Sequence, residues 1–411
     1  MAELADALDL ESSGRPWGFK SLSPDHLNIR PKGLFCIIGL YMKKRKDDLW
    51  GYSLIIAVVF IVFIMIISNS EDSINSNNYI NNNRLQINDL FSIQKNEELE
   101  KVEQVLFKLE ISEEGYDIYK PGGRGYRYGP SIMYYEDGTM DMWMAANGNN
   151  AEWDWITYRH YDGQNWSNEE VVLRPTPNSM DHYSTCDPGA VYFNGYYYLG
   201  YTSTENSFNG GVENCGYVAR SVNPNGPFEK WNGEGWGGNP KPIIVYDLND
   251  SFWGAGEISF VIAGDKLYCY YSWISSEGNF TKLAVADLCE NWPLTLDDKG
   301  VVIEKEASQD SCDVVYNEEH DRFLAVCVHD RFSDVSRIAV YESKDGYNFS
   351  EYTIVRQNFY QHSHNMGISK LPNGHIELGN HLFIGYAYGD GPNNPWGRWS
   401  MRIQKAKLDI K

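Results

Sequence analysis

The sequence predicts an all-β protein built as a five-bladed β-propeller. Aromatic residues make up 14% of the 411 residues, and 29 Tyr, 13 Trp and 37 Gly favour pleated strands joined by tight turns. Five short segments also share one pattern at intervals of 52 to 70 residues, which indicates a repeated structural unit. One position of the pattern, called here the register position, is occupied by Gly129, Asp187, Glu257, Asp313 and Asn365.

Each repeat is long enough for a blade of four antiparallel strands. Residues 120–411, divided among five units, give about 58 residues each. Turns such as Asp137-Gly138 and Asn194-Gly195 separate apolar runs, as they do in β-hairpins. The C-terminal strand near Met401–Leu408 is expected to close the ring. A β-sandwich is the structural alternative, but it gives no reason to repeat a polar position five times.

Residues 1–41 resemble a spurious translation of a tRNA gene. The likeness is carried by Met1–Leu10 and by Gly18–Ser21, which fits the T-arm of a tRNA. The protein itself is therefore expected to begin at Met42. The alternative is a disordered N-terminal tail.

An apolar run follows Met42. The basic cluster Lys43–Lys46 precedes Leu54–Ile67, which is wholly apolar and, with its flanks, is near the length needed to cross a bilayer. No small-residue cleavage site follows, so residues 42–68 are predicted to be an uncleaved transmembrane signal-anchor. The basic cluster should stay in the cytoplasm, which places the remaining chain outside the cell, attached to the membrane.

Residues 69–118 are predicted to connect this anchor to the propeller, which is placed at 119–411. Residues 69–83 contain seven Asn and lack the apolar side chains needed for a core, as in a flexible linker. A short amphipathic helix should follow, because apolar residues recur at helical spacing. These residues are Leu99, Val102, Val105, Leu106 and Leu109.

The net charge of −21 argues against nucleic acid as a partner. The seven cysteines form no zinc-binding pattern, and Cys36 lies outside the predicted propeller. The remaining six permit disulfides in an exported domain. Cys269 and Cys327, however, lie in apolar strand patterns that are typical of buried thiols. Both alternatives stay open.

The register position carries the clue to function. The innermost strands of a propeller line a central channel, so equivalent polar residues gather at one mouth of it. Asp187, Glu257 and Asp313 come from consecutive units, and neighbouring carboxylates push each other's pKa values apart. Hydrolysis of a glycosidic bond uses such a difference, between a protonated acid and an ionised carboxylate. A polar channel lining without catalysis is the alternative.

The predicted propeller resembles the five-bladed glycosidases of glycoside hydrolase family 43 and its relatives in families 32, 62, 68, 117 and 130. The resemblance is carried by Asp187-Pro188-Gly189, Gly195–Tyr198 and Gly254–Glu257. It implies that Glu257 is the general acid and that Asp187 orients it and tunes its pKa. It also implies a poly- or oligosaccharide substrate and no required cofactor, and it is compatible with a Ca²⁺ ion at the propeller axis.

One position departs from the family pattern. The relatives carry the general base as an Asp in the first blade, where this chain has Gly129. Candidates for a displaced base are Asp313, Asp154 and Asp181, and Asp313 is favoured because it shares the register position. With such a base the reaction is expected to invert the anomeric configuration. The rival hypotheses are a carbohydrate-binding propeller that has lost catalysis and, less favoured, a phosphorylase.

Several other side chains are candidates for substrate contacts. Tryptophan can stack on sugar rings, and arginine can bond sugar hydroxyls or a carboxylate. Some relatives place a histidine near the axis at the start of the fifth blade, where this chain has His362 and His364. The predicted substrate-binding set is Arg127, Trp153, Asp154, His182, Trp253, His364 and Arg398.

Overall fold

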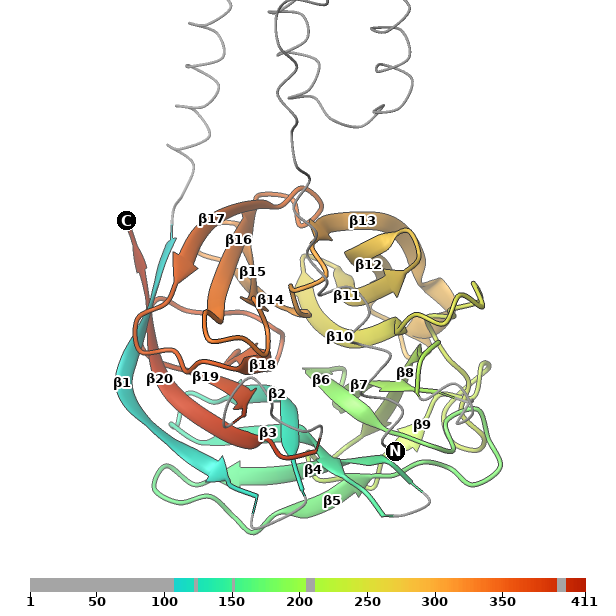
Figure 1. Ribbon diagram of the computed structural model, residues 1–411. Helices are drawn as coiled ribbons and strands as arrows, with labels where there is room; N and C mark the ends of the chain where they lie inside the picture. The colour runs from blue at the N-terminus through green and yellow to red at the C-terminus, as the bar shows by residue number, and fades with distance from the viewer. Residues whose placement is uncertain (1–106, 122–124, 150–151, 205–210, 390–396) are drawn as a thin grey trace, which may run out of the picture. The chain divides into compact units, whose positions relative to one another are not determined.

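The computed structural model contains a ring of five four-stranded antiparallel sheets (Figure 1). It describes residues 107–121, 125–149, 152–204, 211–389 and 397–411. This arrangement confirms the predicted all-β five-bladed propeller. The tRNA-like start, the signal-anchor and the linker, at residues 1–106, lie outside the described residues. Within the described ranges, no helix has both the length and the apolar character needed to span a membrane.

Four blades are each formed by consecutive strands. Blade 1 contains β2 (Arg127–Tyr134), β3 (Met140–Asn147), β4 (Asp154–Tyr161) and β5 (Glu170–Leu173). Blade 2 contains β6 (Cys186–Phe193), β7 (Tyr196–Ser203), β8 (Cys215–Ser221) and β9 (Glu229–Lys230). Blade 3 contains β10 (Gly254–Ala263), β11 (Lys266–Ser275), β12 (Gly278–Asp287) and β13 (Asp297–Lys305), with the 3₁₀ turn η2 (Trp292–Thr295) before its last strand. Blade 4 contains β14 (Cys312–Asn317), β15 (Arg322–His329), β16 (Arg337–Ser343) and β17 (Ser350–Val355).

Blade 5 joins the two ends of the propeller. It contains β18 (Ser363–Ile368), β19 (Gly379–Tyr388), β20 (Ser400–Ile410) and β1 (Phe107–Tyr119). Strand β1 pairs antiparallel with β20 from Phe107 opposite Ile410 to Tyr119 opposite Met401, and the two lie side by side in Figure 1. The strand near Met401–Leu408 therefore takes part in ring closure as predicted, but the outermost strand comes from the N-terminal side.

This pairing corrects the predicted boundary between linker and propeller. The sequence predicts residues 107–118 to belong to the linker and helix, yet they form most of β1. Leu109, the last residue of the expected helix, lies in this strand; the earlier helix residues lie outside the described ranges. Phe107, Leu109 and Ile111 are buried on alternate positions, the period of a strand that packs one face on a core.

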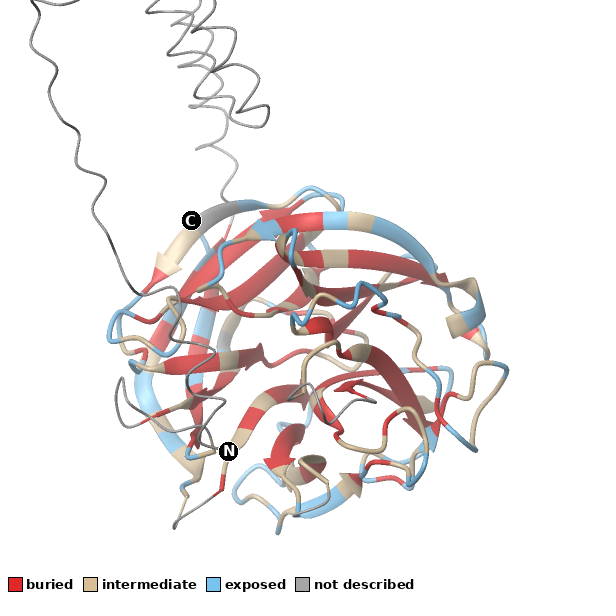
Figure 2. Ribbon diagram, turned by 45° about the vertical axis from the view of Figure 1, so that its right-hand side comes forward, coloured by how far each residue is buried: buried red, intermediate tan, exposed pale blue. Residues whose placement is uncertain are grey.

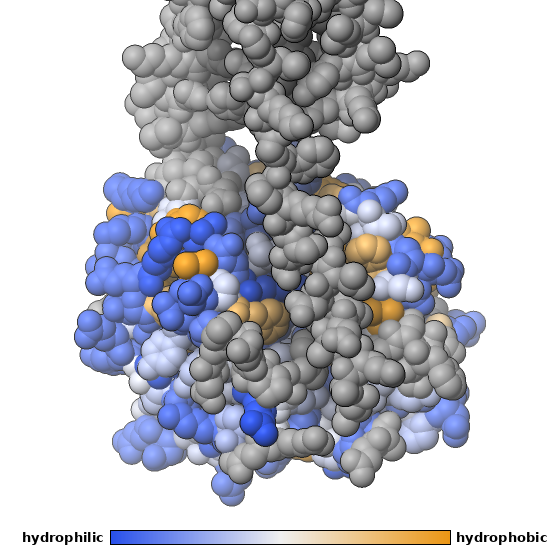
Figure 3. All heavy atoms as spheres, in the orientation of Figure 1, coloured by the Kyte–Doolittle hydropathy of each residue, from blue (hydrophilic) through white to orange (hydrophobic). Residues whose placement is uncertain are grey.

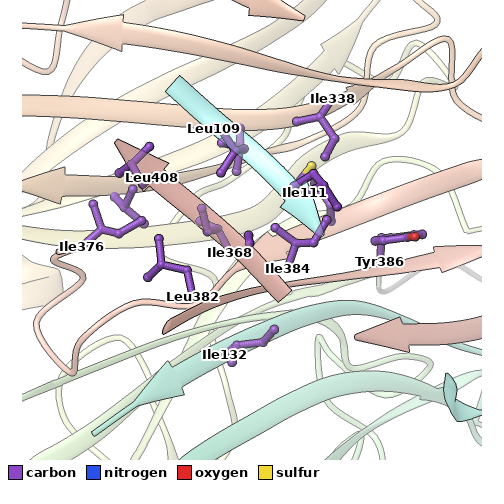
Figure 4. Close-up of a cluster of buried hydrophobic side chains, with 14 of the residues drawn as sticks. Leu109, Ile111, Ile132, Ile338, Ile368, Ile376, Leu382, Ile384, Tyr386 and Leu408 are labelled. Carbon is purple, nitrogen blue, oxygen red and sulfur yellow. The ribbon is translucent and has the colours of Figure 1, made fainter. Parts of the chain in front are cut away.

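The core lies between the blades, where the faces of neighbouring sheets meet (Figure 2). The largest cluster joins blades 1, 4 and 5 and contains the apolar face of β1. Leu408 of β20 lies opposite Leu109 of β1 in this cluster, and Ile111 of β1 lies beside Ile384 of β19 (Figure 4). Burial of these side chains holds the closing strand against the ring.

The innermost strands β2, β6, β10, β14 and β18 surround the middle of the ring (Figure 1). In four of them a β-bulge interrupts pairing with the next strand at the register position. Gly129, Asp187, Glu257 and Asn365 have φ values of 56°, 49°, 50° and 40° there. Strand β14 has no bulge, and its pairing runs unbroken from Cys312. The register is thus a conformational repeat in four blades.

The visible described surface is mainly hydrophilic, with apolar residues scattered over it (Figure 3). This distribution fits the net charge of −21 and leaves the apolar side chains to the spaces between blades. Cys269 and Cys327 are buried free thiols, as their apolar strand patterns indicated.

Candidate active site

The five register residues meet at one pocket on the propeller axis. All five are partly exposed, whereas most of the strand residues that follow them are buried. The cavity between the strands has a volume of about 30 Å³, which is enough room for a water molecule. The residues at the pocket wall include Gly129, Asp187, Glu257, Asp313 and Asn365.

Glu257 is held in place by residues of blades 2 and 5. Its backbone N–H donates a hydrogen bond of 2.7 Å to Thr202 Oγ1, and its Oε1 accepts one of 2.8 Å from Asn365 Nδ2. Burial, and next the negative charge of Asp310, raise the pKa of Glu257. Lys305 acts in the opposite direction. A carboxyl group with a raised pKa keeps its proton to higher pH, which is what a general acid requires.

Asp187 lies within electrostatic reach of Glu257. Burial, and next the charge of Glu257, raise the pKa of Asp187 well above its usual value. A neighbouring negative charge disfavours ionisation, so Asp187 holds its proton to higher pH than an ordinary carboxyl group. A Cβ atom at Gly129 would lie 3.3 Å from Asp187 Oδ1, so the blade-1 register position adjoins this pair but offers no side chain.

Asp313 reaches the pocket wall but is engaged elsewhere. Its Oδ1 accepts hydrogen bonds of 2.6 Å from the buried Lys370 and 2.7 Å from Ser259, and its Oδ2 accepts one of 2.9 Å from the Ile368 N–H. These contacts tie β14 to both neighbouring blades. In this strand without a bulge, the carboxylate lies between the blades and forms an ion pair with Lys370.

Asp310, two residues before β14, was missed by the sequence analysis. Its Oδ2 accepts a hydrogen bond of 2.7 Å from the Asn365 N–H, and its Oδ1 accepts one of 3.3 Å from Arg331. Burial acts to raise the pKa of Asp310, but Arg331 and these hydrogen bonds outweigh burial and hold it below its ordinary value. Asp310 is therefore the ionised charge beside Glu257. An Asp before a strand is commonly a turn residue, so the sequence offered no signal.

Asp154 stands at the start of β4 in blade 1, the blade that lacks a register side chain. It accepts hydrogen bonds of 2.5 Å from Tyr126 and 3.1 Å from Ser184. Burial raises the pKa of Asp154 to about 6. Its charge also contributes to the raised pKa of Asp187, so Asp154 lies within electrostatic reach of the pair.

Asp181, the third candidate base, lies outside the pocket. Its side chain is fully buried, forms an ion pair with Lys230, and accepts hydrogen bonds from Tyr201 and Ser179. These contacts leave no oxygen for a substrate or water. We therefore assign Asp181 a structural role, which corrects its nomination as a base.

The predicted substrate contacts are spread over the blades, and none of them forms the pocket wall. Arg127 pairs with Glu169 at 2.6 Å, which ties β2 to the loop before β5. Trp153 stacks on Tyr183 with ring centroids 5.6 Å apart, and His182 contacts the same tyrosine ring at 3.8 Å. This aromatic group adjoins Asp154, which directly follows Trp153 in the chain.

Of the other three residues, two lie at inner strands, and Arg398 lies two residues before β20, the third strand of blade 5. Trp253 precedes β10, and its carbonyl accepts a hydrogen bond of 2.7 Å from the Asn214 side chain. Arg398 is exposed. His364 is buried, and its Nδ1 donates a hydrogen bond of 2.7 Å to Asn365 Oδ1. This bond directs the Asn365 amide nitrogen towards Glu257. Burial lowers the pKa of His364 to about 4, so the ring is neutral at pH 7.

The donor set does not suit a metal ion. Among the residues that the structure describes, no group of three or more His, Cys, Asp or Glu side chains is arranged to bind one. His364 offers one ring nitrogen, because its Nδ1 bonds Asn365. We therefore assign no role to Ca²⁺ at the axis.

Comparison with solved structures shows which proteins share this fold. The chain is similar to a family 117 glycoside hydrolase from the marine bacterium Zobellia galactanivorans, with TM-score 0.53 and 17% identity over 74% of this chain and 91% of that one. It is also similar to a thermostable family 43 glycoside hydrolase, with TM-score 0.52 and 14% identity over 72% and 96% of the two chains.

A third similar structure is an α-L-arabinofuranosidase from Podospora anserina in complex with cellotriose, with TM-score 0.54 and 11% identity over 71% and 95% of the two chains. No protein-family model and no curated protein matches the chain. At these identities the likeness establishes a shared five-bladed fold.

Proposed function

We propose that this protein is a glycoside hydrolase that cleaves a poly- or oligosaccharide with Glu257 as its general acid. The observation that carries the proposal is the Asp187–Glu257 pair on the propeller axis. Burial raises both pKa values, and the charge of Glu257 adds to the rise at Asp187 while the charge of Asp310 adds to the rise at Glu257, so both groups hold a proton to higher pH than an ordinary carboxyl group. The similar structures with glycoside hydrolase names support the same substrate class.

Asp154 is our candidate for the base that activates water. The favoured candidate from the sequence, Asp313, is bonded by Lys370, whereas Asp154 lies in blade 1 and reaches Asp187 electrostatically. With a pKa of about 6, Asp154 is largely ionised at pH 7 yet basic enough to accept a proton. We expect an acid and a base from blades 3 and 1 to act on opposite sides of the sugar and to invert its configuration.

These roles are tested by measuring how turnover depends on the leaving group, with a panel of aryl glycosides and polysaccharides as substrates. Glu257→Gln should lower turnover of substrates with poor leaving groups by about 10²–10⁴-fold and spare activated aryl glycosides, which need no proton. Asp154→Asn should slow both classes, because both need activated water. Asp137→Asn, on the exposed β2–β3 turn, is the matched control. Full turnover of a polysaccharide by Glu257→Gln would contradict the acid assignment.

The anomeric configuration of the first product shows whether the reaction inverts or retains configuration. Proton NMR during early turnover should show the anomer opposite to that of the substrate. Retention would contradict the inverting mechanism and leave the acid assignment standing.

The missing side chain at Gly129 favours one rival, a propeller that binds carbohydrate without cleaving it. Calorimetric binding of a sugar together with the absence of product over long incubation would support this rival.

We also propose that the propeller acts outside the cell, attached to the membrane by residues 42–68. The basic cluster and the apolar run support this placement. Protease treatment of intact cells tests it, because the propeller should be cleaved without lysis.

A further inference from the structure

Two cysteines face each other across adjacent strands of blade 4. Cys312, the first residue of β14, pairs directly with Cys327 of β15. Both are buried free thiols, with exposed fractions of 5% and 0%. Paired residues of an antiparallel sheet point their side chains to the same face, so the two sulfur atoms are neighbours.

The backbone pattern fixes the type of this pair. The N–H groups of Val314 and Tyr316 donate to Ser259 Oγ and to the carbonyl of Gly374, away from β15. Backbone direction alternates along a strand, so Cys312 also turns its backbone away from β15. Cys312 and Cys327 are thus a non-hydrogen-bonded pair, with a typical Cα separation of about 4.5 Å. Disulfides span about 4.4–6.8 Å between Cα atoms, so the bond can form with little backbone movement.

The pocket gives small molecules access to this pair. Cys312 lies in the pocket wall, whereas Cys327 lies behind it and is fully buried. The cavity of about 30 Å³ has room for a water-sized molecule beside Cys312. A hydrogen bond with the Cys327 thiol lowers the pKa of Cys312 to about 7 against the effect of burial, and Lys305 adds to the lowering. Cys312 is therefore the better nucleophile of the two.

We propose that Cys312 and Cys327 form a redox site that a small hydroperoxide oxidises to a disulfide. The Cys312 thiolate attacks one oxygen of hydrogen peroxide, which breaks the O–O bond and gives a sulfenic acid and hydroxide. The Cys327 thiol then attacks the sulfenic sulfur, a disulfide bond forms, and water leaves with the Cys327 proton. The two thiols lose two electrons in total, and the peroxide gains them.

Peptide mapping tests this site in the full-length protein with hydrogen peroxide as the probe. After treatment, the protein is denatured, its free thiols are blocked with N-ethylmaleimide, and trypsin is added. Cleavage after Lys305, Arg322 and Arg331 places the two cysteines on separate peptides, 306–322 and 323–331, each with one cysteine. We expect a linked pair of these peptides that increases with peroxide and is lost on reduction.

Variants separate the two chemical steps. Cys327→Ser should stop the reaction at the Cys312 sulfenic acid, which dimedone labels. Cys312→Ser should leave Cys327 fully available to N-ethylmaleimide after denaturation. Cys269 is buried without exposure and serves as an internal control that stays reduced.

Two results would overturn the proposal. One is full labelling of both Cys312 and Cys327 at a peroxide dose that oxidises the exposed Cys289. The other is oxidation of Cys269 together with the pair, because unfolding would then have exposed all three thiols. Neither outcome depends on glycosidase activity, so the redox site and the proposed function are tested separately.

Discussion

The side-chain amide of Asn365 on blade 5 donates a hydrogen bond of 2.8 Å to the carboxylate of Glu257 on blade 3. Its orientation is fixed by His364, which donates to the other end of the same amide at 2.7 Å. The bond joins two non-adjacent blades across the axis. It also bears on protonation, because a donor stabilises the charged form of a carboxylate.

Loss of this donor should change the pH profile of the proposed reaction. In Asn365→Ala, the pKa of Glu257 should rise, because its ionised form loses a partner while burial and the charge of Asp310 remain. The basic limb of kcat/KM against pH should therefore move upward, by about one pH unit or less. An unchanged basic limb in an active Asn365→Ala variant would show that another group sets it.

Lys370→Met should be strongly destabilising. Lys370 is 1% exposed and pairs with Asp313 at 2.6 Å, so its removal leaves a carboxylate uncompensated between blades. We expect a loss of about 3–5 kcal/mol in the free energy of unfolding, measured with urea. The double variant Lys370→Met/Asp313→Asn should recover part of this loss. Additive losses in the two single variants would contradict the coupling.

His364 should make stability depend on pH. Its pKa is about 4 in the folded protein and near 6.5 when unfolded, so the unfolded chain binds the proton first as pH falls. The contribution is present above about pH 6.5 and is lost as pH falls towards 4, up to about 3 kcal/mol in total.

The measurement is the free energy of unfolding of wild type and His364→Gln at several pH values. The difference between them should shrink as the pH falls from 6.5 to 4. His381→Gln is the control, because the His381 side chain is 42% exposed. A constant difference between wild type and His364→Gln would refute the prediction.

Leu408→Ala should weaken closure of the ring. Leu408 is 1% exposed and packs beside Leu109 of the closing strand, so truncation leaves a cavity. The expected loss is about 2–5 kcal/mol in the free energy of unfolding. Ile410→Ala, two residues further on the same strand, is the matched control, because Ile410 is 44% exposed and should cost roughly 0.5 kcal/mol or less.

The sequence was sufficient to predict the ring because the same strand-and-turn pattern occurs five times. Each unit repeats an apolar inner strand, a hairpin turn and a polar position at the axis, and the repetition itself indicates radial symmetry. Asp187, Glu257 and Asn365 all face the pocket as the repeat implied.

The local sequence does not predict β1 as a strand, because apolar residues at helical spacing overlap there with apolar residues at strand spacing. Val102, Val105, Leu106 and Leu109 fit a helix, whereas Phe107, Leu109 and Ile111 fit a strand. The choice depends on pairing with β20, almost 300 residues away in the chain. Tertiary contacts of this range override local propensity.

The register pattern favours Asp313 as the base only if all five inner strands have the same backbone geometry. The register position in blades 1, 2, 3 and 5 lies in a bulge, but β14 pairs without one. One missing extra residue turns the Asp313 carboxylate towards Lys370, and Asp310 approaches Glu257 instead. A shift of this kind changes no residue type, so the sequence pattern does not reveal it.

Pairing of β1 with β20 also determines the order in which the domain can be completed during synthesis. Blades 1 to 4 are contiguous in the chain, so each can form its sheet as soon as its last strand has left the ribosome. Blade 5 needs residues 107–119, which are made before blades 1 to 4, and residues 400–410, which are made after them. The apolar face of β1 therefore remains without its partner until β20 has been made, and it is exposed to aggregation throughout that time.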